Sequence, residues 1–285
     1  MPFAGVQITG ARIVGDIDLK NAKLIRPIAI VGSRIEGAIK LGHARTDSLI
    51  LLEGSLMNGP FDADSLHAES DLFLRNGVVF KSAMSLNGAK IDGDVDMTGA
   101  SLECKLDADS LQAGGALYMR SEGQNKASFR DVVLNGAKIT GQVSMVGASF
   151  EGTLNAHSLQ VGGSLLMYSR AENKASFKDV VLRFAKITGQ FSMKGASFSD
   201  RLDADSLQAG GHLVMRDANY AHLVDMVFAH VGGSLDLRGA TLNGLDLSGA
   251  SIAADLVLGE PGKPTVWKGN IRKPGALNLR NTRIG

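Results

Sequence analysis

Apolar residues alternate with polar ones in short stretches, and these stretches recur every eleven residues. The unit that begins at Ala137 reads A-x-I-x-G-x-V-x-M, and the same pattern returns at Ala148 and again at Leu159. A period of two residues is typical of β-strands, and the i, i+3, i+4 spacing of a helix is absent. Each unit therefore predicts two short strands, A-x-I and V-x-M, with a corner at the glycine between them.

The eleven-residue register extends over nearly the whole chain. It begins at Ala11, needs one extra residue between Leu66 and Val78, and persists to Ala250. Strands of two or three residues are stable only when they pair with the same strand of the next coil, about 4.8 Å away. Two units make a coil of 22 residues. We therefore predict an all-β protein, residues 1–285, that forms a single parallel β-solenoid of about 12 coils. Its regular repeat would span 6–258 and its irregular basic coils 259–285.

A longer period of 48 residues indicates loops on alternate coils. Residues 86–133 and 134–181 begin with nearly the same sequence, and a third copy begins at Leu182. The excess over two coils predicts insertions at 120–126 and 169–174, and a more divergent one at 216–220. All three follow an equivalent methionine, so they should project from one edge. The charged and amide residues of this candidate interaction edge are Arg120, Glu122, Asn125, Lys126, Arg170, Glu172, Asn173, Lys174 and Arg216.

Two interpretations of this loop edge stay open. Neighbouring loops could brace one another through salt bridges, or simply descend from a duplication. They could instead bind a protein or an anionic ligand.

A second candidate surface is apolar. Outward residues of an exposed strand are normally polar, so apolar exceptions at one repeated position indicate a covered surface. Either the loops fold back over this surface, or a partner or second copy of the chain covers it. The members of this candidate apolar interface are Leu51, Phe73, Tyr118, Leu166 and Val214.

Composition supports a narrow core and argues against a strongly charged binder. The chain has 35 glycines and only 5% aromatic residues, which suits many tight corners. Its net charge of +1 does not favour a general nucleic-acid binder or an acidic DNA mimic. The outward acidic row is short, comprising Asp62, Asp107, Asn155 and Asp203, and the other outward row carries Asp96, Ser144 and Ser192.

Segments such as 137–141 (AKITG) and 148–152 (ASFEG) resemble pentapeptide-repeat proteins. That resemblance implies a right-handed square β-helix. The spacing here alternates between five and six residues, and Lys, Ser or Gln usually replaces the Asp or Asn of the motif. Two strands per unit are also similar to bactofilins, β-helices that polymerise end to end. Neither resemblance carries functional residues onto this chain.

Motifs for catalysis, cofactors or metals are not found. No G-x-x-x-x-G-K-[ST] phosphate loop is present. The six histidines form no metal-ligand spacing with Cys104, and this cysteine has no evident histidine partner that would activate it as a nucleophile. We therefore predict no catalytic, cofactor-binding or metal-binding residues. A site that uses Glu122 and Glu172 is the enzymatic alternative.

The two ends of the chain also carry information. The N-terminus lacks a signal sequence and no apolar segment could span a membrane, so a cytoplasmic protein is expected. The strand pattern already holds at Val6 and still holds at Ile284, so the chain is either a fragment or its ends meet something. Trp267 is expected to form a partial cap. The basic residues of the last coils are Lys263, Lys268, Arg272, Lys273, Arg280 and Arg283.

These features favour a non-enzymatic structural or interaction protein that presents the loop edge and the apolar face to a protein partner. The alternatives are a self-assembling scaffold of bactofilin type and a nucleic-acid-related role through mimicry or the basic C-terminus.

Overall fold

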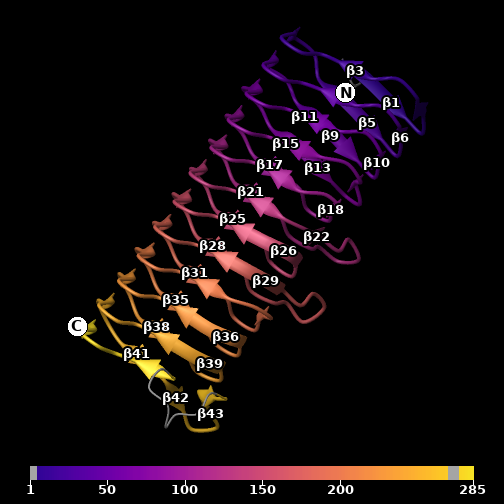
Figure 1. Ribbon diagram of the computed structural model, residues 1–285. Helices are drawn as coiled ribbons and strands as arrows, with labels where there is room; N and C mark the ends of the chain where they lie inside the picture. The colour runs from indigo at the N-terminus through magenta and orange to yellow at the C-terminus, as the bar shows by residue number, and fades with distance from the viewer. Residues whose placement is uncertain (1–4, 269–275) are drawn as a thin grey trace.

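The computed structural model describes residues 5–268 and 276–285 and confirms the predicted fold. These residues contain strands, turns and bends but no helix. Parallel strands stack into a β-solenoid of about 12 turns, with equivalent residues about 22 positions apart. The coils run as a rod from the indigo N-terminal end to the yellow C-terminal end (Figure 1).

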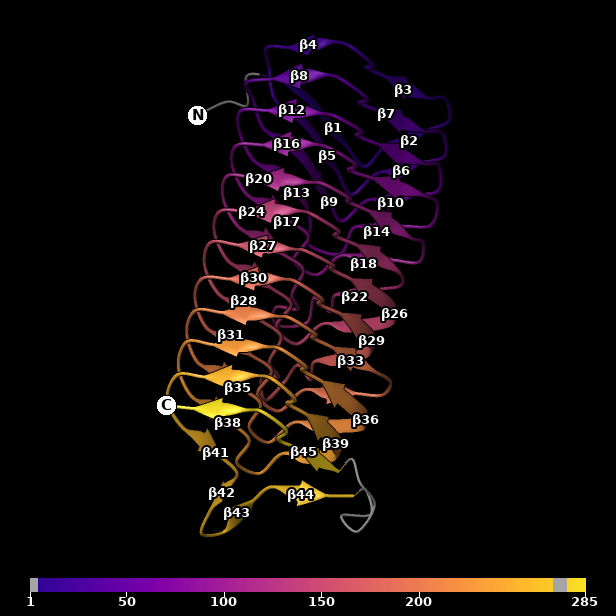
Figure 2. The same ribbon diagram turned by 60° about the vertical axis from the view of Figure 1, so that its left-hand side comes forward.

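Each coil passes through sheet A, sheet B and sheet C in turn. It contributes one strand to sheet A, one strand to sheet C, and either two short strands or one long strand to sheet B. Sheet A has 12 strands, sheet B has 20 and sheet C has 12. The stacked strands of sheets C and B form two columns in Figure 2. Sheet A comprises β1 (Val6–Thr9), β5 (Ile28–Val31), β9 (Ile50–Glu53), β13 (Leu72–Arg75), β17 (Val95–Asp96), β21 (Leu117–Tyr118), β25 (Val143–Ser144), β28 (Leu165–Leu166), β31 (Phe191–Ser192), β35 (Leu213–Val214), β38 (Leu235–Asp236) and β41 (Leu256–Val257).

Sheet C comprises β4 (Lys23–Leu24), β8 (Arg45–Thr46), β12 (His67–Ala68), β16 (Lys90–Ile91), β20 (Gln112–Ala113), β24 (Lys138–Ile139), β27 (Gln160–Val161), β30 (Lys186–Ile187), β34 (Gln208–Ala209), β37 (His230–Val231), β40 (Ser251–Ile252) and β46 (Arg283–Ile284).

Sheet B comprises β2 (Arg12–Ile13), β3 (Ile17–Asp18), β6 (Arg34–Ile35), β7 (Ile39–Lys40), β10 (Leu56–Met57), β11 (Phe61–Asp62), β14 (Val79–Phe80), β15 (Met84–Ser85), β18 (Ser101–Leu102), β19 (Leu106–Asp107), β22 (Ser128–Phe129), β23 (Val132–Val133), β26 (Ser149–Asn155), β29 (Ser176–Val181), β32 (Ser197–Phe198), β33 (Leu202–Asp203), β36 (Asn219–Asp225), β39 (Thr241–Asp246), β44 (Val266–Trp267) and β45 (Leu277–Asn278). A short antiparallel hairpin pairs β42 (Gly259–Glu260) with β43 (Lys263–Pro264).

The pairing register locates the extra residue that the sequence required between Leu66 and Val78. Leu52 pairs with Leu74, 22 positions on, whereas Leu56 pairs with Val79, 23 positions on. The additional residue therefore lies in the corner after β13. Asn76 and Gly77 both have positive φ there, 56° and 83°, which are conformations that Gly and Asn tolerate.

Inward side chains stack on their counterparts in the next coil. A run of five aromatic rings in sheet B lies along the rod, with ring centres about one coil apart. The separations are 5.0 Å for Phe129–Phe150, 5.1 Å for Phe150–Phe177, 5.2 Å for Phe177–Phe198 and 4.8 Å for Phe198–Tyr220. We call these five residues the aromatic ladder. All are buried, and offset stacking adds to the burial of apolar area.

Two of the three predicted insertions are present, and the third prediction is wrong. Ser101 pairs with Ser128 and Ser149 with Ser176, each 27 positions on, so five residues are inserted in each of these corners. Both loops project from one side of the rod (Figure 1). In contrast, Phe198 pairs with Tyr220, 22 positions on, so 216–220 contains no insertion. Tyr220 is an inward member of the aromatic ladder.

A cluster near the N-terminal end makes stability depend on pH. The Glu36 carboxylate accepts hydrogen bonds from Asn58 (2.5 Å), Arg34 (2.7 Å) and Arg12 (3.1 Å). These contacts hold the pKa of Glu36 at about 2, below its ordinary value of 4.5. Because the unfolded chain binds this proton more tightly, the contribution to stability is present above pH 4.5 and is lost as the pH falls toward 2.

NMR titration of the Glu36 carboxyl is therefore expected to give a pKa of about 2, and Asn58→Ala is expected to raise it. A titration midpoint at the ordinary value in the folded protein would contradict the cluster.

Candidate functional site

The five apolar residues of the predicted interface lie in one outward column of sheet A. Leu51 pairs with Phe73 on the next strand of sheet A. Towards the C-terminal end, each further member of the column pairs with the residue on the next strand, as far as Val257. From Phe73 onward large side chains occupy every second coil, and the coils between them carry small or acidic ones. From Phe73 to Val257 the column consists of Phe73, Asp96, Tyr118, Ser144, Leu166, Ser192, Val214, Asp236 and Val257.

Burial in this column is unusual for the outer face of a sheet. The five large residues Leu51, Phe73, Tyr118, Leu166 and Val214 are each half-buried. The residues between them are buried: Ser144 is 2% exposed and Ser192 is 6% exposed. The large side chains thus shield the short ones, and the face forms a ridged apolar stripe, which we call the ridge column.

Arginines at the edge of sheet A cover the two aromatic rings of the ridge column. The Arg75 guanidinium carbon lies 4.1 Å from the centre of the Phe73 ring, and that of Arg120 lies 4.7 Å from the centre of the Tyr118 ring. These are cation–π distances. Arg75 also donates to Glu53 (2.7 Å) and Asp96 (3.2 Å). Aromatic rings of the column are therefore shielded by neighbouring arginines.

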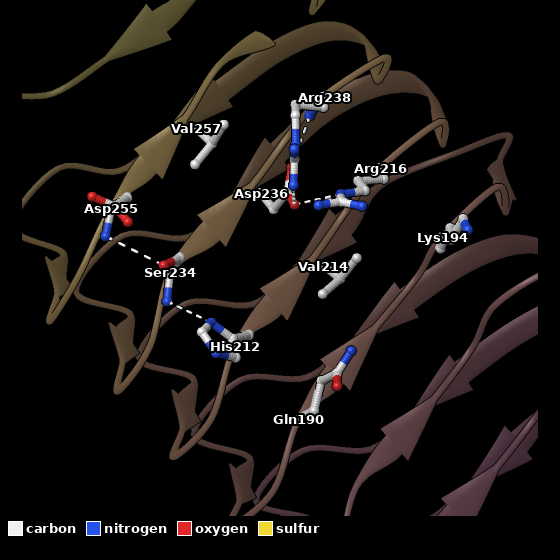
Figure 3. Close-up of a pocket in the computed structure, with 10 residues that line it drawn as sticks. All are labelled: Gln190, Lys194, His212, Val214, Arg216, Ser234, Asp236, Arg238, Asp255 and Val257. Carbon is white, nitrogen blue, oxygen red and sulfur yellow. Dashed lines mark hydrogen bonds and ion pairs between the residues drawn. The ribbon is translucent and has the colours of Figure 1, made fainter. Parts of the chain in front are cut away.

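Towards the C-terminal end the column becomes the floor of a groove of about 460 Å³. Figure 3 shows Val214, Asp236 and Val257 along its centre. Lys194, Arg216 and Arg238 form one wall, and Gln190, His212, Ser234 and Asp255 form the other. Arg216 and Arg238 both pair with Asp236, and Arg238 also reaches Glu260 at 2.7 Å. The Asp236 and Glu260 charges are thus paired with arginines, and Lys194 is the one basic residue of this wall without an ion pair among the described residues.

The two loops brace one another. Lys126 Nζ donates to the Glu172 carbonyl at 3.1 Å and to the Asn173 side-chain oxygen, and Asn173 Nδ2 donates to the Gly123 carbonyl at 3.3 Å. Asn173 is only 3% exposed, whereas Glu122, Asn125, Glu172 and Lys174 are exposed. The bracing interpretation is therefore supported for these two loops. Lys126 and Asn173 join them by hydrogen bonds, and no ion pair between described residues connects one loop with the other.

The predicted equivalence holds for the two asparagines of the loops but not for the arginines and glutamates. Asn125 lies against the corner glycine of the coil before it, Gly99, and Asn173 lies in the same way against Gly147. The Arg170 amide donates to the Asn173 carbonyl at 2.8 Å, as the Glu122 amide donates to the Asn125 carbonyl at 2.9 Å, so Arg170 takes the place of Glu122. Arg120 approaches Glu122 at 3.8 Å within its own loop. Each loop base is closed by a serine that the sequence did not single out. Ser121 and Ser169 accept from Ala127 and Ala175, both at 2.9 Å.

Arg216 does not belong to the loop edge. It lies in a regular corner with no insertion, and it pairs with Asp236 in the groove of sheet A. Arg216 shares its position in the coil with Arg120, because their carbonyls accept from the corner glycines Gly195 and Gly99. In the coil of Arg170 this position is held by Tyr168, whose carbonyl accepts from Gly147. The hairpin β42–β43 follows β41, the last strand of sheet A. The two loops of the earlier coils also follow sheet A strands, so the hairpin leaves the coil at the equivalent point.

Other predicted features are dispersed or neutralised. Cys104 is half-buried, and burial raises the pKa of its thiol, which disfavours the reactive thiolate. In the acidic row, Asp62 pairs with Lys20, Asp107 with Lys105, and the buried Asp203 with Arg183 and Arg201. Among residues 5–268 and 276–285, no three His, Cys, Asp or Glu side chains cluster as a metal site would require.

The C-terminal basic residues that the structure describes lie in different elements and do not form one group. Lys263 lies in the hairpin and approaches Asp217 at 3.7 Å, and Arg283 lies in β46 of sheet C. Trp267 is half-buried over Leu242 in the last coil, where it packs against the core. Arg272 and Lys273 lie outside the described residues.

Comparisons with known proteins gave no match to a protein-family model, a curated protein or a solved structure. Within the part of the chain that the structure describes, there is no helix long and apolar enough to cross a membrane.

Proposed function

We propose that this protein is a rigid, non-enzymatic interaction rod that binds a protein partner along the outer face of sheet A. The observation that carries this proposal is the ridge column, in which large apolar side chains recur on every second coil of an outward face. Burying such a stripe against a partner would be favourable by roughly 25 cal/mol for each Å² of apolar area. A continuous solenoid core keeps the ridges at fixed spacing, so little ordering of the rod is needed on binding.

The charges around the middle of the ridge column favour an acidic segment of the partner. From Tyr118 to Val214 the column itself carries no carboxylate. Basic side chains on the adjacent wall and loops outnumber the two glutamates Glu122 and Glu172; they are Arg120, Lys126, Arg170, Lys174 and Lys194. Charge complementarity of this kind guides encounter and register more than it raises affinity.

The same charges oppose a face-to-face dimer of two antiparallel rods. A two-fold axis along the strands would set the basic edge of one copy against the basic edge of the other. Like charges facing each other across an interface are destabilising, so a partner of different sequence suits this face better.

A photo-crosslinking amino acid in place of Leu166 tests the proposal in cells that make the protein. Val181 provides a matched control because it is also apolar, outward and half-buried, but lies on sheet B. We expect discrete adducts with one protein at position 166 and none at position 181, and we expect Arg120→Glu with Lys194→Glu to reduce them.

Light scattering of the purified chain gives the second readout. A monomer is expected at all concentrations. Equal crosslinking at both positions, or adducts at position 166 that contain only a second copy of the chain, would refute a sheet A partner site.

A further inference from the structure

The outer face of sheet C carries a second repeated surface, separate from the ridge column. Its outward positions in the middle coils alternate between lysine and glutamine, and all of them are exposed: Gln112, Lys138, Gln160, Lys186 and Gln208, followed by His230. These strands lie one above another in the column that runs through β20, β24, β27 and β30 (Figure 2). Lys138 and Lys186 form no ion pair with any residue of 5–268 or 276–285.

Two shallow hollows on this face are successive copies of one site. The first, of about 310 Å³, is lined by Lys138, Thr140, Gln160 and Gly162 and reaches Lys186 and Thr188. The second, of about 260 Å³, is lined by Lys186, Thr188, Gln208 and Gly210 and reaches His230. Each residue of the first set has its counterpart 48 positions on, so the two hollows are two coils apart. No carboxylate lines either of them.

Two exposed phenylalanines lie at the corner that leads into this face. Phe184 and Phe228 have φ of 56° and 54°, and their exposed fractions are 52% and 67%. Other coils place Asn, His, Ser or Gly at this corner, as at Ser158 and Ser206. A positive φ is unfavourable for a bulky residue, and such strain is retained where the side chain has a role. Phe184 packs edge-on against the His157 ring, with 5.5 Å between ring centres, and the Phe228 ring lies over Gly249. Both side chains nevertheless remain exposed and so are accessible to a ligand.

We propose that sheet C binds a linear anionic polysaccharide along the rod axis. Repeated subsites suit a repeating ligand. Lysines can pair with carboxylates, the Gln and Thr side chains can donate to and accept from sugar hydroxyls, and exposed phenyl rings offer apolar surface to sugar faces. The row across one coil at Phe184, Lys186 and Thr188 combines all three contacts. This inference does not depend on the proposed partner of sheet A.

The spacing of the lysines favours a polysaccharide over a nucleic acid. Lysines two coils apart are separated by roughly 9.6 Å, twice the distance between adjacent strands. Each strand of a duplex carries one phosphate for about every 3.4 Å of axis, so most phosphates would have no partner here. A polysaccharide with one carboxylate in each disaccharide has its charges much farther apart, which matches sparse lysines better.

The test uses hyaluronan oligosaccharides, which carry one carboxylate per disaccharide, with binding to the full chain measured by calorimetry. We expect binding that weakens as salt rises. Lys138→Ala with Lys186→Ala is expected to weaken it about tenfold, since each exposed ion pair contributes modestly. Phe184→Ser with Phe228→Ser is also expected to weaken binding about tenfold while leaving the fold intact, because serine already occupies this corner in other coils. Lys105→Ala on sheet B is the control and should bind normally.

Three results would overturn the inference: no binding of hyaluronan to the wild-type chain, equal binding by wild type and the lysine or phenylalanine double variants, or tighter binding of oligo(dT) than of hyaluronan. Thermal denaturation of each variant verifies that a loss of binding is not a loss of fold. Because crosslinking at position 166 reports on sheet A alone, either proposal can fail without the other.

Discussion

Replacing Phe177 with alanine is expected to lower the free energy of unfolding by about 3–5 kcal/mol, the range for truncating a buried phenylalanine. Phe177 lies at the centre of the aromatic ladder, 5.1 Å from the Phe150 ring and 5.2 Å from the Phe198 ring. Its side chain is buried, and the rings on both sides are held by their own coils, so neither can fill the cavity. Urea denaturation followed by circular dichroism measures the loss.

The matched control is Phe184→Ala, seven residues further along the chain. Phe184 is 52% exposed and already adopts a positive φ that alanine tolerates no better, so its replacement should change stability by less than about 1 kcal/mol. Similar losses in the two variants would show that burial in the ladder is not what distinguishes them.

The fold was largely predictable because the repeat determines nearly every contact in the core. Inward positions of one coil lie on inward positions of the next, so the period of Ala137 and its counterparts specifies strand, corner and partner together. The extra residue between Leu66 and Val78 could be inferred for the same reason, and the structure places it in the corner after β13. Sequence spacing therefore specifies the stacking register without any knowledge of long-range contacts.

The prediction failed where a variable stretch concealed the register. Residues 216–220 read as an insertion because they follow Met215, as the other two stretches follow Met119 and Met167, and because Arg216 resembles Arg120 and Arg170. Ala218 and Tyr220 in fact continue the A-x-I pattern, 22 positions after Ala196 and Phe198. The Tyr220 hydroxyl is buried with the Met193 sulfur as its nearest partner, and burial raises the pKa of this tyrosine. A tyrosine in an inward position was the signal that could have revealed the register.

The candidate surfaces were only partly predictable. Listing outward apolar residues was enough to find the ridge column, but not the arginines that cover Phe73 and Tyr118, because side-chain conformation decides those contacts. The lysine and glutamine column of sheet C was missed, although aligning the middle residue of every A-x-I strand would have shown it. Strain at Phe184 depends on the backbone angle of its corner, which only the structure provides.

Gly59→Ala is expected to destabilise the protein by about 3 kcal/mol, whereas the same change at Gly15 should be nearly neutral. Gly15, Gly37 and Gly59 occupy the same corner in successive coils, and none has a positive φ. A methyl group on Gly59 would overlap the Gly37 carbonyl, and one on Gly37 would overlap the Gly15 carbonyl, while one on Gly15 meets no atom within 4 Å among the described residues. A positive φ therefore affects neither variant, and the difference that the structure shows between the two sites is the space around the added methyl group. Urea midpoints of the two purified variants measure the difference, and equal losses would show that contact between stacked corners does not require glycine.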